Sequence, residues 1–248
     1  MTILALEFSS PQRSVAVLDL MEGSASSLPK KDGALTKQCP PNKTAEVVEA
    51  GAGGTRAMGM IETVLHEAGL EREQIDVIAV GLGPGSYTGI RVALSIAQGW
   101  QLARGVKLLG ISSAECLAAQ AWSEKIFGRV NVVIDAQRNE FYRAVYDISQ
   151  SAWKEIEPLQ ITGPAEIQSS TATGETWIGP EATRWFPSGR VIFPRATTLG
   201  QLGAGRNDFV SGDKLAPIYL RATNFVKAPP VNPVAQSNFW SPPAKPEA

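Results

Sequence analysis

Histidine and cysteine are nearly missing from this sequence. It contains one histidine, His66, and two cysteines, Cys39 and Cys116, in 248 residues. Protein zinc sites and Ser-His or Cys-His nucleophile systems both depend on histidine, so we expect neither metal-dependent nor triad chemistry. The cysteines lie far apart and no secretory segment is visible at the start. We therefore expect free thiols in a reducing, cytoplasmic compartment.

An excess of charge of one sign and long apolar runs are lacking too. Lys and Arg number 23 against 24 Asp and Glu, which gives a formal net charge of -1. A protein that binds nucleic acid alone normally carries a basic excess, so we expect only weak nucleic-acid binding by the chain itself. The longest apolar stretch, residues 90–102, is too short and too interrupted to span a membrane. With 44% hydrophobic residues the chain can still bury a core.

A glycine-rich turn between a strand and a helix organises the chain. Residues 77–80 predict a short apolar strand, and an apolar helix is expected over 88–104. The turn between them contains Pro84 and four glycines, Gly81, Gly83, Gly85 and Gly89. This order of elements can present backbone N–H groups to a phosphate. The turn lacks the Lys-Ser/Thr pair of a P-loop and the third glycine of the dinucleotide fingerprint. A plain strand-to-helix turn is therefore the alternative.

The apolar periodicity predicts two long helices. Residues 56–68 carry their apolar side chains on one face, with Met58 and Met60 outside that stripe. In residues 88–104 the apolar positions cover an arc of about 220°, roughly twice what one sheet needs to bury. This second helix is either enclosed by its own domain or offers an apolar face to another protein.

Three segments carry a resemblance to one family. Residues 83–91, Gly-Pro-Gly-Ser-Tyr-Thr-Gly-Ile-Arg, resemble the signature of the bacterial TsaB (YeaZ) proteins. Residues 134–142, Ile-Asp-Ala-Gln-Arg-Asn-Glu-Phe-Tyr, resemble that family's hairpin, and 216–221, Ala-Pro-Ile-Tyr-Leu-Arg, its closing motif. The resemblance extends over residues 3–221. It implies a non-catalytic subunit of the tRNA threonylcarbamoyladenosine machinery.

The resemblance also implies a fold. We expect an α/β structure of the actin-like ATPase (ASKHA) type, in which two α/β lobes stack and the second is reduced. The expected domains are residues 1–111 and 112–222, followed by a proline-rich tail over 223–248. In this fold an acidic residue on the first strand lies beside the nucleotide phosphates. The corresponding nucleotide contacts in this chain are Glu7, Ser9, Gly83, Gly85, Ser86 and Asp135.

Two of these positions argue against turnover of ATP. Glu7 stands where the fold favours Asp, and its extra methylene would displace a water or metal held by the carboxylate. The turn after Asp135 contains Gln137 and Arg138 where a second phosphate turn needs glycine. An independent actin-like ATPase or phosphotransferase that uses the Gly83–Gly89 loop is nevertheless the main alternative function. A peptidase, another label attached to this superfamily, would need a nucleophile or metal system that one histidine does not supply.

The resemblance further implies partners. We expect a TsaD-like threonylcarbamoyl transferase to bind helices 56–68 and 88–104 as a heterodimer. A TsaE-like ATPase would join it, and tRNA would bind only through the complex. The chain alone could form a homodimer, and no membrane contact is expected. No cofactor or metal is required, although ATP or ADP at the partner interface is compatible with the family. The expected interface residues are Arg56, Met60, Ile61, Val64, Tyr87, Thr88, Arg91, Val92, Ser95 and Ile96.

One region departs from the family pattern. The family's His-Ser-Glu triplet before the first long helix is absent, and the residues Gly51–Thr55 fill that region. We therefore expect a remodelled loop there.

Overall fold

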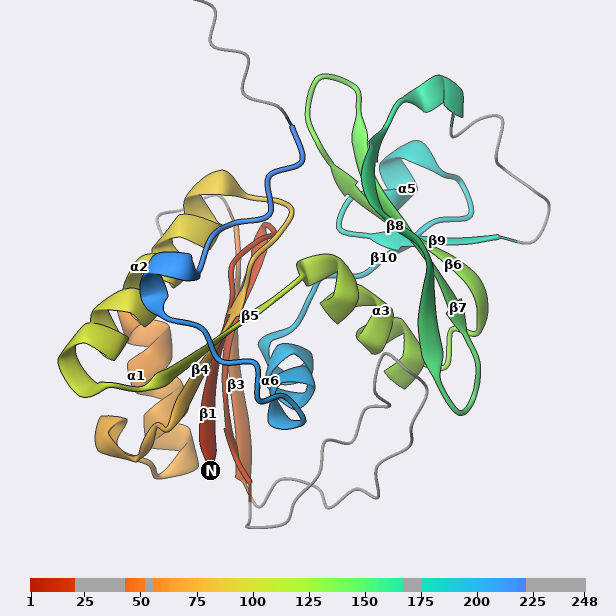
Figure 1. Cartoon of the computed structure of the whole chain (residues 1–248). Coiled ribbons are helices and arrows are strands. Elements are labelled where there is room, and N and C mark those ends of the chain that lie inside the picture. Colours follow the sequence, from red (N-terminus) through yellow and green to blue (C-terminus); the bar gives the residue numbers. More distant parts are fainter. Residues whose placement is uncertain (21–42, 52–55, 167–174, 222–248) are drawn as a thin grey trace, which may run out of the picture.

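The computed structural model describes residues 1–20, 43–51, 56–166 and 175–221 (Figure 1). Within them, two five-stranded sheets are separated by helices, and further helices cover the outer faces. The expected tail over 223–248 and most of the Gly51–Thr55 loop lie outside the described residues. The layers therefore run from α1 and α2 through the first sheet, α6 and α3 to the second sheet and α5.

The first sheet has the strand order β3-β2-β1-β4-β5. Its strands are β1 (Thr2–Glu7), β2 (Gln12–Asp19), β3 (Lys43–Ala50), β4 (Val77–Gly81) and β5 (Lys107–Ile111). The central β1 pairs antiparallel with β2 and parallel with β4. Ile3 and Ala5 face the interior of the molecule, whereas Leu4 and Leu6 face the outer helices. Both faces of β1 are buried, which explains its continuous apolar sequence.

Helices α1 (Ala57–Ala68) and α2 (Tyr87–Arg104) cover the outer face of this sheet. Each ends on a glycine in the left-handed region, Gly69 at φ 61° and Gly105 at φ 70°. Glycine adopts this conformation without the steric cost that a side chain adds. A 3-10 turn, η1 (Arg72–Gln74), follows α1. The predicted bounds 56–68 and 88–104 are confirmed to within one residue.

The second sheet repeats the topology of the first. Its order is β10-β9-β6-β7-β8, and β6 pairs antiparallel with β7 and parallel with β9, as β1 does with β2 and β4. The strands are β6 (Gly128–Asp135), β7 (Phe141–Ile148), β8 (Trp153–Thr162), β9 (Thr176–Gly179) and β10 (Arg190–Val191). The expected actin-like arrangement of two α/β lobes is confirmed. Between its last two strands this lobe carries only α5 (Ala182–Trp185), where the first carries α2.

Two helices fill the space between the sheets. Helix α3 (Ser113–Ser123) packs on the second sheet, and α6 (Ala196–Ala204) packs on the first. The Ala196 N–H donates to the Ser14 hydroxyl at 2.8 Å. Further along, Val210 bridges to Leu108 of β5 before the turn η2 (Gly212–Lys214). Helix α6 and Val210 thus contact the first sheet although they follow the second in the chain, because local sequence does not indicate which sheet a helix will cover; the division into residues 1–111 and 112–222 stays a prediction.

Candidate functional site

A cleft of about 900 Å³ opens between the two lobes, at the ends of β1 and β6. The β1–β2 turn and the first turn of α2 line one side. The end of β6, the turn after it and the start of α5 line the other. Of the predicted nucleotide contacts, Ser9, Gly85, Ser86 and Asp135 line this cleft. Glu7 and Gly83 are buried and do not line it.

The glycines of the turn over residues 83–89, which we call the signature turn, allow it to lie against the end of β1. A side chain at Gly85 would place its Cβ 2.1 Å from the Ser9 carbonyl oxygen, and one at Gly89 would lie 2.0 Å from the Phe8 carbonyl oxygen. The Ser86 N–H donates to the Ser9 carbonyl at 2.6 Å. The close approach that requires glycine is therefore an approach to the protein's own backbone. This geometry agrees better with the plain strand-to-helix turn than with a phosphate loop.

The N-terminus of α2 faces the cleft. Ser86 caps the helix, and its hydroxyl accepts from the Gly89 N–H at 3.3 Å. The N–H groups of Tyr87 and Thr88 belong to the first helical turn and have no intrahelical acceptor. The helix dipole adds partial positive charge at this end. This side of the cleft is therefore electropositive even though its side chains are mostly uncharged.

Glu7 lies beneath the signature turn, fully buried. Its carboxylate accepts from the Ser9 N–H at 2.8 Å and from the Ser113 hydroxyl at 2.9 Å. Ser113 also accepts from the Gly83 N–H at 3.2 Å. Burial raises the pKa of Glu7, although these hydrogen bonds oppose the shift. Glu7 thus connects β1 to the signature turn and to the start of α3, and it does not line the cleft.

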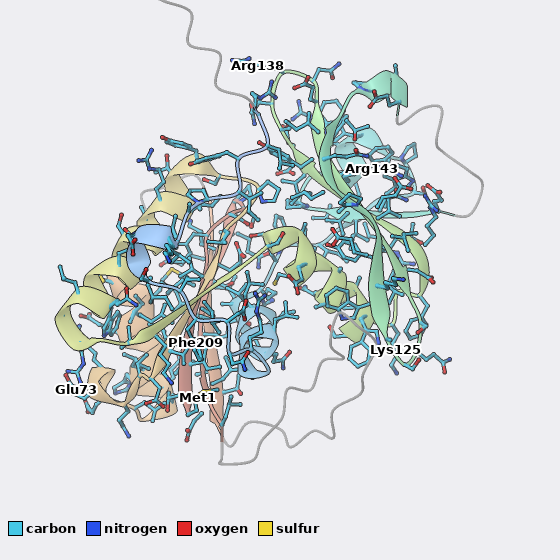
Figure 2. All side chains as sticks on the ribbon, in the orientation of Figure 1. Met1, Glu73, Lys125, Arg138, Arg143 and Phe209 are labelled. Atoms are coloured by element: carbon cyan, nitrogen blue, oxygen red, sulfur yellow. The ribbon has the colours of Figure 1, made fainter. Side chains whose placement is uncertain are left out.

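The opposite side of the cleft carries two carboxylates. Asp135 Oδ1 accepts from the Gln137 N–H at 2.7 Å. Burial raises the pKa of the neighbouring Glu181; a hydrogen bond from the Asp135 backbone opposes the shift and the Asp135 charge adds to it. The turn that follows has three consecutive residues with positive φ, Gln137 at 63°, Arg138 at 56° and Asn139 at 59°. Figure 2 shows Arg138 at the outer tip of this hairpin.

The closing motif joins the two sides. The Ile218 N–H donates to the Leu82 carbonyl at 2.9 Å, just after β4. Three residues later, the Arg221 guanidinium donates to the Ala136 carbonyl at 2.9 Å and pairs with Glu140 at 2.6 Å. Sequence reasoning matched this motif to the family but assigned it no contact, and nothing in the local pattern indicates its partners.

The predicted partner residues divide into exposed and buried groups. Arg56, Tyr87, Thr88, Arg91 and Ser95 are exposed, and Val92 and Ile96 are half-buried. In contrast, Met60, Ile61 and Val64 lie in the core between α1 and the sheet. In the free chain these three side chains are therefore not on the surface, although we expected Met60 outside the apolar stripe. Met60 precedes Val64 by one helical turn and so shares its inward face, whereas the exposed methionine is Met58.

A shallow groove of about 400 Å³ runs along α2 beside α1 and η1. We call it the helix groove; its residues are Met58, Arg72, Glu73, Ser95, Ile96, Gly99, Trp100, Ala103 and Arg104. Val92, Ile96 and Trp100 follow one another at helical spacing and are only partly covered by the core. Glu73 (Figure 2) pairs with Arg104 at 2.9 Å near the end of α2. The wide apolar arc predicted for α2 is thus only partly buried.

The described residues contain neither a group of metal-ligating side chains nor a candidate membrane span. No three His, Cys, Asp or Glu side chains gather there to hold a metal ion. His66 lies on the exposed face of α1, and Cys116 is fully buried in α3. No helix among these residues is long and apolar enough to cross a membrane.

Comparisons with known proteins agree with this architecture. The profile of the family "TsaD: tRNA N6-adenosine threonylcarbamoyltransferase" matches residues 54–235. The tRNA threonylcarbamoyladenosine biosynthesis protein TsaB of Escherichia coli is 29% identical over 67% of this chain and 79% of its own length. The Haemophilus influenzae protein of the same name is also 29% identical, over 67% of this chain and 78% of its own.

A solved structure gives the same result in three dimensions. YeaZ from Pseudomonas aeruginosa aligns with a TM-score of 0.70 and 26% identity, over 88% of this chain and 99% of that protein. The TsaD-type profile includes all three motifs, and the YeaZ structure aligns with most of the chain. The chain therefore belongs to the TsaB (YeaZ) family, within the wider group of TsaD-type proteins.

Proposed function

We propose that this chain acts in tRNA threonylcarbamoyladenosine biosynthesis as a non-catalytic subunit that binds a TsaD-like transferase. The names of its TsaB relatives support the pathway. The single structural observation that supports a binding role is the helix groove, an incompletely covered apolar surface on α2. Because tRNA is modified in the cytoplasm, we place its action there.

The groove has the chemistry of a helix-binding surface. Its floor is apolar, through Ile96 and Trp100, and Gly99 lets a second helix approach closely. Exposed Met58 is a flexible side chain that can adapt to a partner. Arg72 and Arg104 lie at its edge, where they are held by acidic partners. A partner helix with an apolar stripe would bury this surface, and in the free chain the same surface could support a homodimer.

The cleft argues for a supporting role over a catalytic one. Gly85 and Gly89 lie against the backbone of Ser9 and Phe8, just after β1. Glu7 is buried beneath them, and Asp135 is followed by a turn without glycine. These residues do not fit the phosphates of ATP. A TsaE-like ATPase would then supply nucleotide hydrolysis, and tRNA would bind through the assembled complex, since this chain has no basic excess. ATP or ADP at the partner interface would be held mainly by the partner.

A pair of matched substitutions tests the binding role. Ile96→Glu places a carboxylate in the helix groove, whereas Ile156→Glu places one on an exposed isoleucine of β8 in the other lobe. An unpaired charge buried at an interface costs about 2 kcal/mol or more, which weakens Kd about 30-fold. Titration calorimetry with the TsaD-like protein should show this loss for Ile96→Glu alone.

The outcome can contradict the proposal in two ways. Equal binding by both variants, each with a wild-type circular dichroism spectrum, would place the interface elsewhere. Exposed Ser95→Arg provides a second test that does not disturb the core contact of Ile96. Phosphate release by the isolated chain above a buffer blank would instead support the alternative, an independent actin-like ATPase.

A further inference from the structure

Residues Ile218–Arg221 contact both lobes within four positions. At one end the Ile218 N–H donates to the Leu82 carbonyl of the first lobe. At the other end Arg221 contacts Ala136 and Glu140 on the turn between β6 and β7 of the second lobe. In Figure 1 this last described segment, drawn in blue, passes from the side of α2 toward the β6–β7 hairpin. It therefore crosses from one side of the cleft to the other.

Between these two ends, Tyr219 stacks on Tyr87 of α2. The ring centroids are 5.7 Å apart and the ring planes differ by 29°. The Arg91 guanidinium lies 4.9 Å from the centre of the Tyr87 ring and donates to its hydroxyl. Both rings remain about half exposed, Tyr87 at 55% and Tyr219 at 51%. A protein that covered the N-terminal part of α2 would touch this stack directly.

The turn that Arg221 contacts is conformationally strained. Three successive residues other than glycine adopt positive φ at positions 137–139. Such conformations persist only where surrounding contacts determine them. Inside the turn, the Ala136 N–H donates to the Glu140 carbonyl at 3.0 Å, and the Glu140 N–H donates to the Gln137 carbonyl at 3.1 Å. Arg221 adds contacts to Ala136 and Glu140 from outside the hairpin.

The strained turn is also part of the cleft. Asp135, Ala136 and Gln137 line it, on the side opposite the N-terminus of α2. A change in the Arg221 contacts would therefore alter the shape of the cleft. A displacement of Tyr87 would move Tyr219, which stacks on it, and Arg221, two residues further along the chain, contacts the same turn.

We propose that Ile218–Arg221 is a strap that couples the N-terminal surface of α2 to the strained turn and sets how far the cleft opens. A partner that covers Tyr87 and Tyr219 holds the strap against α2, and the strap then holds the two lobes at one distance from each other. Because coupling between two equilibria is reciprocal, an open cleft must weaken whatever binds the α2 surface. This second half rests on the proposed binding of a TsaD-like partner, whereas the strap itself is a property of the free chain.

The strap is tested by the distance between the lobes in the free protein. Spin labels on His66→Cys in α1 and Lys154→Cys in β8 report this distance, since both positions are exposed. Cys39→Ser removes one native thiol, and Cys116 is fully buried. Arg221→Ala should broaden the distance distribution by several ångström relative to the wild type. Arg190→Ala, which removes an exposed arginine from β10, should leave it unchanged.

Two further variants make the result decisive. Arg221→Lys keeps a positive charge opposite Glu140 and should restore most of the narrow distribution. Glu140→Gln removes the charge that Arg221 pairs with and should broaden the distance distribution. Identical distributions for wild type, Arg221→Ala and Glu140→Gln would overturn the strap, whatever the partner does.

The coupling is tested by the affinity for the TsaD-like protein. Arg221 lies outside the helix groove, yet Arg221→Ala should weaken binding about 3- to 10-fold. Unchanged affinity together with a broadened distance distribution would overturn the coupling and leave the strap standing. Absence of binding by the wild type would refute the proposed function and the coupling with it, while the distance measurement would still decide on the strap.

Discussion

Gly81 is the position where one added methyl group should do most harm. An ideal Cβ at Gly81 would lie 2.1 Å from Glu7 Oε2 and 2.6 Å from Glu7 Cδ. Both the strand and the carboxylate are buried, so the Glu7 side chain must shift by about 1 Å to make room. Its hydrogen bonds from Ser9 at 2.8 Å and from Ser113 at 2.9 Å cannot both survive such a shift.

The expected cost follows from these two effects. Overpacking a core typically costs about 1–3 kcal/mol, and losing one hydrogen bond to a charged group costs about 1.5–3 kcal/mol. We expect Gly81→Ala to lower the free energy of unfolding by about 3 kcal/mol, which corresponds to a fall in Tm of about 6–12 °C. Gly59→Ala is the matched control. Gly59 lies in α1 with no atom within 4 Å of an added Cβ, so alanine should stabilise the helix by about 0.5–1 kcal/mol.

A double-mutant cycle measured by urea unfolding tests the cause. Glu7→Ala removes the carboxylate that an alanine at position 81 would strike, and itself destabilises by leaving the Ser9 N–H and the Ser113 hydroxyl without their acceptor. In that background Gly81→Ala should cost less than about 0.5 kcal/mol. If the losses in free energy of unfolding from Gly81→Ala and Glu7→Ala simply add, the cost at Gly81 does not come from a clash with Glu7. The packing of Glu7 against Gly81 would then be refuted.

Three further predictions concern the free chain. Burial raises the pKa of Glu7 in the folded state, so the unfolded chain releases this proton first as the pH rises. The free energy of unfolding should therefore fall as the pH rises from about 4.5, the ordinary pKa, to the higher folded-state pKa. In urea unfolding across this range Glu7→Gln should lose that part of the pH dependence, and an unchanged profile would refute it. Met60 is 2% exposed, so Met60→Glu should lower the free energy of unfolding by more than about 3 kcal/mol. Met58 is 47% exposed, so Met58→Glu should lower it by less than about 0.5 kcal/mol. Equal unfolding midpoints for the two variants would contradict this. In a Cys39→Ser variant, Cys116 should resist thiol reagents at pH 8 until the protein unfolds, since burial holds its pKa well above the ordinary value; rapid labelling of the native protein would contradict this.

Short-range pattern was sufficient for the elements that carry the proposed partner surface. The apolar spacing over residues 56–68 and 88–104, with Gly69 and Gly105 after them, predicted α1 and α2 almost to the residue. The same reasoning failed for Met60, which lies at the margin of the apolar arc. Whether a marginal position is buried depends on how the helix rests on β2 and β3, and that is a tertiary property.

The cleft depended on contacts between distant segments. Glu7 lies buried beneath the signature turn, where it accepts a hydrogen bond from the hydroxyl of Ser113, 106 positions away. Arg221 reaches Ala136 across 85 positions. Strand β8 carries Pro158 and half-exposed residues because it is an edge strand, so the sequence pattern over residues 153–162 is weak. No local periodicity encodes such pairings.

The repeated topology gives a structural reason for the different roles that we propose for the two lobes. Both sheets place a parallel strand beside the central one and then turn outward, after Gly81 in the first lobe and after Gly179 in the second. In the first lobe 18 residues follow as α2, whose buried face covers the sheet and whose other face forms the helix groove. In the second lobe the corresponding helix, α5, has 4 residues and is too short to bury one face and present another. Among the described residues, only the first half therefore has a helix long enough for both tasks, and the strap proposed at Ile218–Arg221 links the reduced half to the N-terminal end of that helix.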